Sequence, residues 1–73
     1  MNIKEKFGLR IRILREQKKY SIEHLANISD VDRNYLSAIE KGKRNCSLEI
    51  QEKLISGLEM EFADFFNDAV FEK

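Results

Sequence analysis

Apolar residues recur at helical spacing along most of this chain and predict five helices with short connections. The first helix is predicted over residues 3 to 18, where apolar side chains follow one another at spacings of three and four. Its stripe consists of Ile3, Phe7, Ile11 and Leu14. Gly8 lies inside this helix at a cost of about 1 kcal/mol in helix propensity, which indicates a close contact there. We therefore expect an all-α fold.

The central stretch, residues 21 to 41, has the pattern of two short helices joined by a tight polar corner, which is typical of a helix-turn-helix. Ser21 and Asp32 are good N-caps for its two helices. Asp30 lies at the corner, and Asp tolerates left-handed backbone better than most residues. The apolar side chains expected to join the two helices are Leu25, Ala26, Ile28, Val31, Leu36 and Ile39.

Residues 47 to 71 predict two further helices for packing and dimerisation. Gly42 is expected to end the third helix in left-handed conformation, and Ser47 to cap the fourth. A fifth helix is predicted to begin near Phe62 and to continue through Phe71. The fourth helix is expected to bury Leu48, Leu54, Ile55 and Leu58. Residues 1 to 73 then form one domain.

Composition favours a small helical domain that does not rely on disulfides. The chain of 73 residues is 42% hydrophobic and 36% charged, with no proline. A single core is marginal at this size, so we expect further burial in a partner. Cys46 is the only cysteine, which excludes an intrachain disulfide. No apolar run reaches membrane length and the start is not a signal peptide, so a cytoplasmic protein is expected.

The charges are unevenly distributed although their formal sum is zero. Residues 1 to 46 hold eleven Lys and Arg against six acidic residues, whereas residues 47 to 73 hold two lysines against seven. Phosphate binding responds to the local field, so a basic half can act beside an acidic one. The alternative is that both halves carry ordinary solvated charge.

Side chains suited to DNA project from the second helix of the helix-turn-helix. Arg33 and Asn34 can make paired hydrogen bonds to guanine and adenine edges, although Arg33 could also be a solvated charge. Lys41 faces outward on the same helix. The loop that follows is expected to lie along a phosphate backbone through Lys43, Arg44 and Asn45.

From Phe7 to Phe66 the chain resembles the Cro/repressor-like helix-turn-helix regulators, also called the xenobiotic-response-element family. The residues that carry the resemblance are Gly8, Arg10, Ile11, Leu14, Arg15, Ser21, Leu25, Ala26, Val31, Tyr35, Leu36, Ser37, Ile39, Glu40, Gly42, Arg44, Asn45, Ser47, Leu48, Leu58, Phe65 and Phe66. The segment DRNYLSAIEKGKRN and the short chain look most like controller proteins of restriction-modification systems. Small phage repressors and antitoxins share the scaffold.

The resemblance implies a compact five-helix, lambda-repressor-like domain that binds a palindromic operator of double-stranded DNA as a homodimer. Its third helix would enter the major groove. Carried over by position, the base contacts are Arg33, Asn34 and Ser37. By the same match, Tyr35, Lys43, Arg44 and Asn45 lie at the DNA backbone. We expect Ser21 and Lys41 to contact the DNA backbone as well. Arg15 and Glu40 match a structural pair that bridges the first and third helices.

The chain departs from the family pattern in two places, at Ile22 and at the neighbouring Ile50 and Gln51. Ile22 stands where a DNA-gripping glutamine is usual, so anchoring there must rest on backbone amides, Ser21 or neighbouring lysines. Gln51 replaces a buried aliphatic residue, and Ile50 beside it is apolar. The fourth helix is then either slightly rotated or uses Ile50 in a dimer contact.

The C-terminal aromatic residues exceed what a single small domain can bury, so a dimer interface is expected there. Its predicted members are Ile50, Phe62, Phe65, Phe66, Ala69 and Val70. His24 is interpreted as a surface residue, and Cys46 as a small packing residue rather than a redox switch.

Three classes of function compete. The first is a sequence-specific transcriptional regulator, and the second is a protein-interaction module that has lost DNA binding. The third is an enzyme, for which the sequence offers no nucleophile-base pair, metal cluster or phosphate-binding glycine loop. We expect no cofactor, metal or small-molecule ligand.

Overall fold

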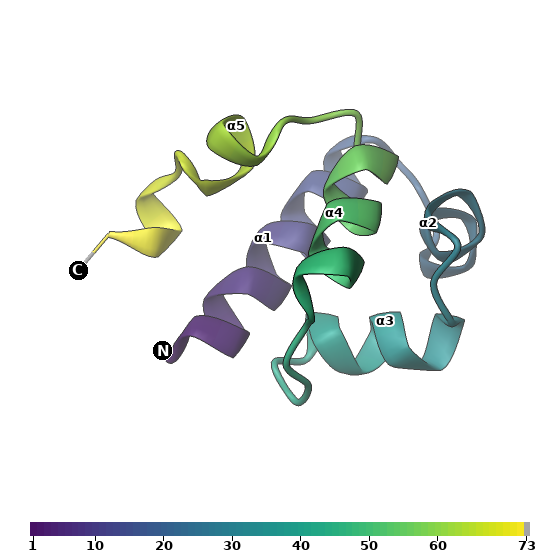
Figure 1. Ribbon diagram of the computed structural model, residues 1–73, viewed down its shortest axis with the longest axis horizontal. Helices are drawn as coiled ribbons and strands as arrows, with labels where there is room; N and C mark the ends of the chain where they lie inside the picture. Colours follow the sequence, from purple (N-terminus) through teal and green to yellow (C-terminus); the bar gives the residue numbers. More distant parts are fainter. Residues whose placement is uncertain (73) are drawn as a thin grey trace.

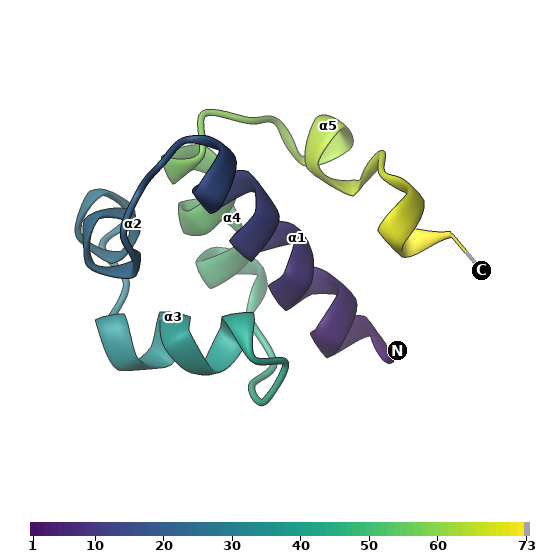
Figure 2. The same cartoon turned by 180° about the vertical axis from the view of Figure 1, so that it is seen from behind.

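The computed structural model describes residues 1 to 72 and folds them into five α-helices and a terminal 3-10 turn. In chain order these are α1 (Ile3–Gln17), α2 (Ile22–Ser29), α3 (Arg33–Glu40), α4 (Leu48–Gly57), α5 (Phe62–Phe66) and η1 (Ala69–Phe71). α3 packs on α1 and α2, α2 also packs on α4, and the C-terminal elements lie against α4 and α1 (Figure 1, and from behind in Figure 2). None of these helices is long and apolar enough to cross a membrane. The all-α prediction is confirmed for the described residues.

The first four helices each begin at a side chain that caps them. Ser21, Asp32 and Ser47 accept hydrogen bonds from amides in the first turns of α2, α3 and α4, as the sequence predicts. α1 begins with a capping box formed by Asn2 and Glu5, which the apolar spacing does not reveal. There the Glu5 amide donates to Asn2 Oδ1, and the Asn2 amide donates to Glu5 Oε1, both at 2.9 Å.

Four helices end in the same left-handed motif. Asp30 (φ 56°) and Gly42 (φ 73°) adopt it as expected, and Lys19 and Glu59 adopt it with φ 60° each. At Gly42, for example, the amide of the next residue donates to a carbonyl five residues back at 3.0 Å. Lys and Glu have no preference for this backbone, so the sequence gives no signal at positions 19 and 59.

The core joins all five helices. Its buried residues are Phe7, Ile11, Leu25, Ala26, Val31, Leu36, Ile39, Leu54, Ile55, Leu58 and Phe65. Three residues expected on buried faces are instead exposed: Ile3 by 63%, Ile28 by 47% and Leu48 by 73%. On α2, Ser29 faces the core in place of Ile28. Leu48 lies two turns before Ile55 on the same stripe, but at the uncovered start of α4.

The predicted fifth helix is wrong in its length, because the chain leaves helical geometry at Asn67 (φ −87°, ψ 73°). Arg10 of α1 stabilises this end of the helix by bonding carbonyls that a longer helix would use. Its guanidinium donates to the carbonyl oxygens of Phe65 at 2.8 Å and Asp64 at 3.2 Å. Asp68 then caps η1 through the amide of Val70 at 3.0 Å.

The close contact expected at Gly8 is confirmed. A Cβ atom on this residue would collide with the main-chain carbonyl of Ile39 in the last turn of α3. Backbone cannot move aside as a flexible side chain can, so Gly8 permits the approach of α1 to α3.

Gly8→Ala should therefore lower the free energy of unfolding by about 2 to 3 kcal/mol, although alanine is the better helix former. Urea denaturation followed by circular dichroism would measure this. An unchanged or increased stability would contradict the close approach.

Gly57 provides a matched control in another helix. A Cβ there would collide with the Ser29 hydroxyl, which is buried and makes no hydrogen bond within residues 1 to 72. In a Ser29→Ala background the collision is removed, so Gly57→Ala should be tolerated within about 1 kcal/mol.

Candidate nucleic-acid interface

α3 presents its polar side to solvent because its apolar side is held in the core. Leu36 and Ile39 are fully buried, which leaves Arg33 and Asn34 exposed in the first turn. Ser37, one turn further along the helix, is half-buried. The three predicted base-contacting residues therefore lie on one short helix. The two with the longest side chains, Arg33 and Asn34, are at its exposed N-terminal end.

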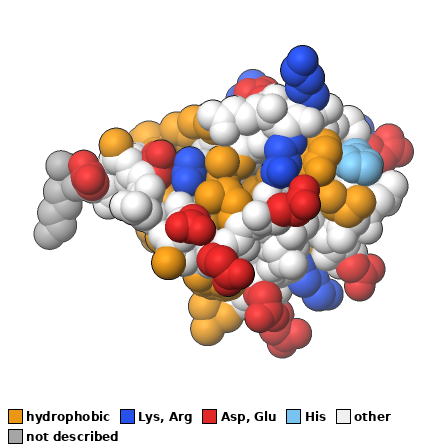
Figure 3. All heavy atoms as spheres, turned by 90° about the horizontal axis from the view of Figure 1, so that it is seen from above, with side chains coloured by type: hydrophobic (Ala, Val, Ile, Leu, Met, Phe, Trp, Pro, Cys, Tyr) orange, Lys and Arg blue, Asp and Glu red, His pale blue; other side chains and the backbone are white. Residues whose placement is uncertain are grey.

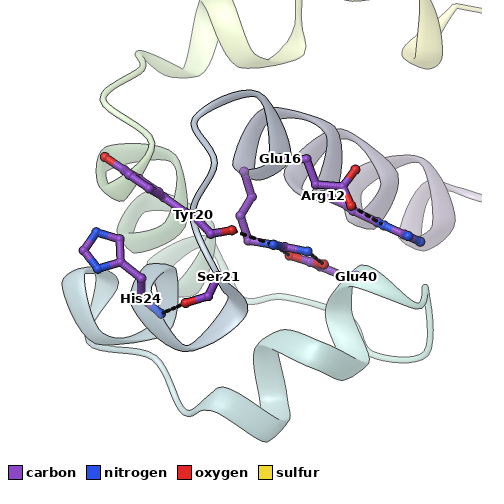
Figure 4. Close-up of polar contacts among 7 residues, drawn as sticks. Arg12, Glu16, Tyr20, Ser21, His24 and Glu40 are labelled. Carbon is purple, nitrogen blue, oxygen red and sulfur yellow. Dashed lines mark hydrogen bonds and ion pairs between the residues drawn. The ribbon is translucent and has the colours of Figure 1, made fainter.

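An ion pair joins α1 and α3 at the two residues expected to bridge them. Arg15 Nε donates to Glu40 Oε2 at 2.7 Å, and Arg15 Nη2 donates to Glu40 Oε1 at 3.0 Å. The same guanidinium donates to the Tyr20 carbonyl at 2.7 Å. Figure 4 draws this hydrogen bond as a dashed line and shows Tyr20 and Glu40 below α1. Hydrogen bonding to Glu40 raises the pKa of Arg15. Both side chains are largely buried, so the pair is structural rather than available to DNA.

The loop after α3 is tied back to that helix by Tyr35. The Tyr35 hydroxyl donates to the Asn45 carbonyl at 2.8 Å, and the Arg44 guanidinium carbon lies 5.1 Å from the centre of the Tyr35 ring. A hollow of about 470 Å³ lies between this loop and the outer side of α3. The loop cation is thus positioned beside the predicted base-contacting residues.

The cations divide into two groups. Four of the basic residues in the first half of the chain form ion pairs within the molecule: Arg10 with Asp68, Arg12 with Glu16, Arg15 with Glu40, and Lys18 with Glu59. Within residues 1 to 72, the others make none: Lys4, Lys6, Lys19, Arg33, Lys41, Lys43 and Arg44. The last four are exposed on α3 and its loop, whereas Lys4 and Lys6 on α1 are half-buried. More of the field available to phosphate therefore comes from α3 and its loop than from α1.

The start of α2 differs from the usual DNA-gripping arrangement. The exposed Ser21 accepts the His24 amide at 3.0 Å, and Ile22 packs against the core. His24 is exposed, and its ring lies 4.5 Å from that of Tyr20 in edge contact. Figure 4 shows Ser21 and His24 on the same turn of α2.

The predicted dimer-interface residues differ in exposure, and one of them does not reach the surface. Phe65 is fully buried, so its assignment to an interface is corrected: it fills the domain's own core. Phe62 is 38% exposed; Ile50, Phe66 and Val70 are half-buried and Ala69 is exposed. On the side opposite α3, apolar and acidic side chains mix (Figure 3).

Cys46 occupies a half-buried position before α4. Gln51 Nε2 donates to the Cys46 carbonyl at 3.2 Å, which gives Gln51 a partner where an aliphatic residue was expected. Burial raises the pKa of the Cys46 thiol to about 11. Within residues 1 to 72, no group of three or more side chains is arranged to hold a metal ion.

A family model described as helix-turn-helix matches residues 11–65. The chain belongs to the helix-turn-helix family. It is 43% identical over 68 residues to control protein C.MunI of a Mycoplasma species, a match that covers 92% of each chain. This member of the family is therefore homologous to proteins named as controllers, and that part of the sequence prediction is confirmed.

Solved structures of helix-turn-helix proteins also show similarity to controller proteins. The restriction-modification controller protein C.AhdI from Aeromonas hydrophila is similar with a TM-score of 0.82 and 43% identity, over 86% of this chain and 96% of that one. C.Esp1396I, solved as a tetramer in complex with its natural 35 base-pair operator, is similar with a TM-score of 0.85 and 33% identity, over 90% and 87%.

The raised pKa of Cys46 predicts that its thiol reacts slowly with alkylating reagents. At pH 8 its thiolate fraction should be about a hundredfold below that of an ordinary cysteine, because thiolate is the reactive form. Alkylation by iodoacetamide should accordingly be much slower in the native protein than in urea. Equal rates in the two states would contradict the packing role.

Proposed function

We propose that this helix-turn-helix protein is a sequence-specific transcriptional regulator, which binds a palindromic operator as a dimer and inserts α3 into the major groove. The observation that carries the proposal is the exposed start of α3 beside cations that have no ion-pair partner within residues 1 to 72. Such an arrangement offers hydrogen-bonding side chains to base edges and positive charge to the adjacent phosphates.

The proposal assigns different work to the two parts of this surface. Arg33 and Asn34 read guanine and adenine edges. Ser37, which has a shorter side chain, contacts a base through its hydroxyl. The remaining residues hold the DNA backbone: Ser21, Tyr35, Lys41, Lys43, Arg44 and Asn45. Tyr35 also supports the loop, because its hydroxyl is engaged with the Asn45 carbonyl.

A controller of a restriction-modification system is the specific role that we propose. It is supported by similarity to proteins of that name over most of the chain, and by the operator complex of a structural relative. The protein would act in the cytoplasm on promoter DNA, as a single helix-turn-helix domain without a cofactor. Because that relative is a tetramer on its operator, two dimers on adjacent sites are included in the proposal.

A second candidate is an interaction module that has lost DNA binding, and the position of Ile22 favours it. This side chain packs against the core instead of reaching outward at the start of α2. The salt dependence of duplex binding separates the two candidates.

If Lys41, Lys43 and Arg44 of both copies meet phosphates, about six counterions are displaced, and log K should fall with log salt with a slope of about −5. Fluorescence anisotropy of a labelled duplex at several salt concentrations measures this slope. Binding absent at low salt would favour the interaction module.

Base reading and backbone holding also predict different mutant behaviour. Arg33→Ala should lose about 1 to 3 kcal/mol of discrimination at one or two base pairs, whereas Arg44→Ala should weaken binding to all sequences alike and reduce the salt slope. Competition binding with single-base variants of a selected site would measure both. An Arg33→Ala protein with unchanged sequence preference would refute the assignment.

A further inference from the structure

An apolar hollow lies where α1 and α4 begin. Its volume is about 330 Å³, and Phe7, Cys46 and Phe66 contribute its apolar lining. Lys4 and Arg44 add positive charge at the same site. Figure 1 and Figure 2 both place the start of α1 and the loop before α4 on the same lower side of the molecule.

Two large apolar side chains stand exposed around this hollow. Ile3, 63% exposed, is part of its lining. Leu48, 73% exposed, lies three residues before Gln51, which also lines the hollow. Residues three apart on a helix are neighbours on its surface, so Leu48 projects next to the hollow. Exposed apolar side chains gathered around a depression are typical of a protein contact.

We propose that this hollow receives Leu48 of a second copy of the chain, while the second copy's hollow receives Leu48 of the first. A two-fold contact requires one surface to carry both the projection and its receptor, and this surface carries both. The inference rests on the proposed function only where that function requires a dimer. It places the centre of the interface at the start of α4 and keeps Phe66 among the predicted interface residues.

Charge complementarity favours a second copy as the occupant. Glu49 directly follows Leu48 and is exposed, so insertion of Leu48 brings this carboxylate beside Lys4 and Arg44 of the other copy. Within residues 1 to 72, neither Lys4 nor Glu49 has an ion-pair partner. Each two-fold contact would therefore bury two leucines and align two pairs of opposite charge at its rim.

The contact also involves the loop that we assign to the DNA backbone. Arg44 lines the hollow on one side and lies over the Tyr35 ring on the other. The hollow begins just after α3 ends, so a two-fold axis beside it directs the C-terminal ends of both α3 helices toward that axis. Dimerisation would thereby hold the loop and align the two recognition helices together.

Sedimentation equilibrium without DNA tests the inference. Leu48→Lys should raise the dimer dissociation constant about tenfold or more, because a cation would have to enter an apolar hollow that already carries Lys4 and Arg44. Ile28→Lys is the matched control: Ile28 is 47% exposed on α2 and does not line the hollow. It should leave the dissociation constant within about twofold of the wild-type value.

A charge reversal tests the reciprocal geometry independently of the apolar insertion. Glu49→Lys and Lys4→Glu should each weaken the dimer severalfold, and the double variant should recover most of the loss. Circular dichroism would establish that every variant remains folded.

A wild-type chain that stays monomeric, or a Leu48→Lys variant that dimerises like Ile28→Lys, would overturn the inference. A dimer disrupted by Val70→Asp but not by Leu48→Lys would instead place the interface at the C-terminal elements and overturn it as well. Each outcome is read without DNA, so failure here is distinct from failure of the operator-binding proposal.

Discussion

The contact between α1 and the last turn of α3 is the constraint on which the rest of the molecule depends. Gly8 allows the backbone of α3 to approach α1 at Ile39, and two turns further along α1 the Arg15 guanidinium grips Glu40. The first contact fixes the distance between the helices, and both act on the last turn of α3. Together with the burial of Leu36 and Ile39, they set the direction in which the exposed face of this eight-residue helix points.

The same packing explains how a chain with no formal net charge presents a positive surface. Arg10 and Arg15 are engaged in contacts within the molecule. Arg10 holds the C-terminal elements against α1, and Arg15 holds α3 against α1. The cations of α3 and its loop are left to the solvent. Basic residues of one sequence region therefore have two physical roles, and burial distinguishes them where a charge count does not.

Much of the fold could be predicted from the sequence because local signals and the core agree. Ser21, Asp32 and Ser47 predict helix starts, and the apolar spacing around them predicts which faces are buried. The errors arise where tertiary contacts override local pattern. Arg10 bonds the end of α5 from more than fifty residues away in the sequence, a contact that no local signal reveals. Leu48 has the correct periodicity for burial but lies beyond the elements that would cover it.

In the candidate site too, features set by local sequence could be predicted, and features set by tertiary contacts could not. Arg33 and Asn34 could be placed on an exposed helix from sequence spacing, whereas the Tyr35 contact with the loop depends on the path of the chain after Gly42. The family resemblance predicted the Arg15 and Glu40 pair, and its geometry shows why that pair is unavailable to DNA. Assignment of an interface from apolar content alone failed at Phe65, because the core of this small domain needs that ring.

Selection of bound duplexes from a random DNA pool, with the number of chains per bound duplex recorded, would show whether this protein reads a palindromic operator as a dimer. We expect a palindromic consensus bound by an even number of chains, with half-sites about one helical turn apart. The absence of any enriched sequence, from a folded protein at low salt, would contradict it.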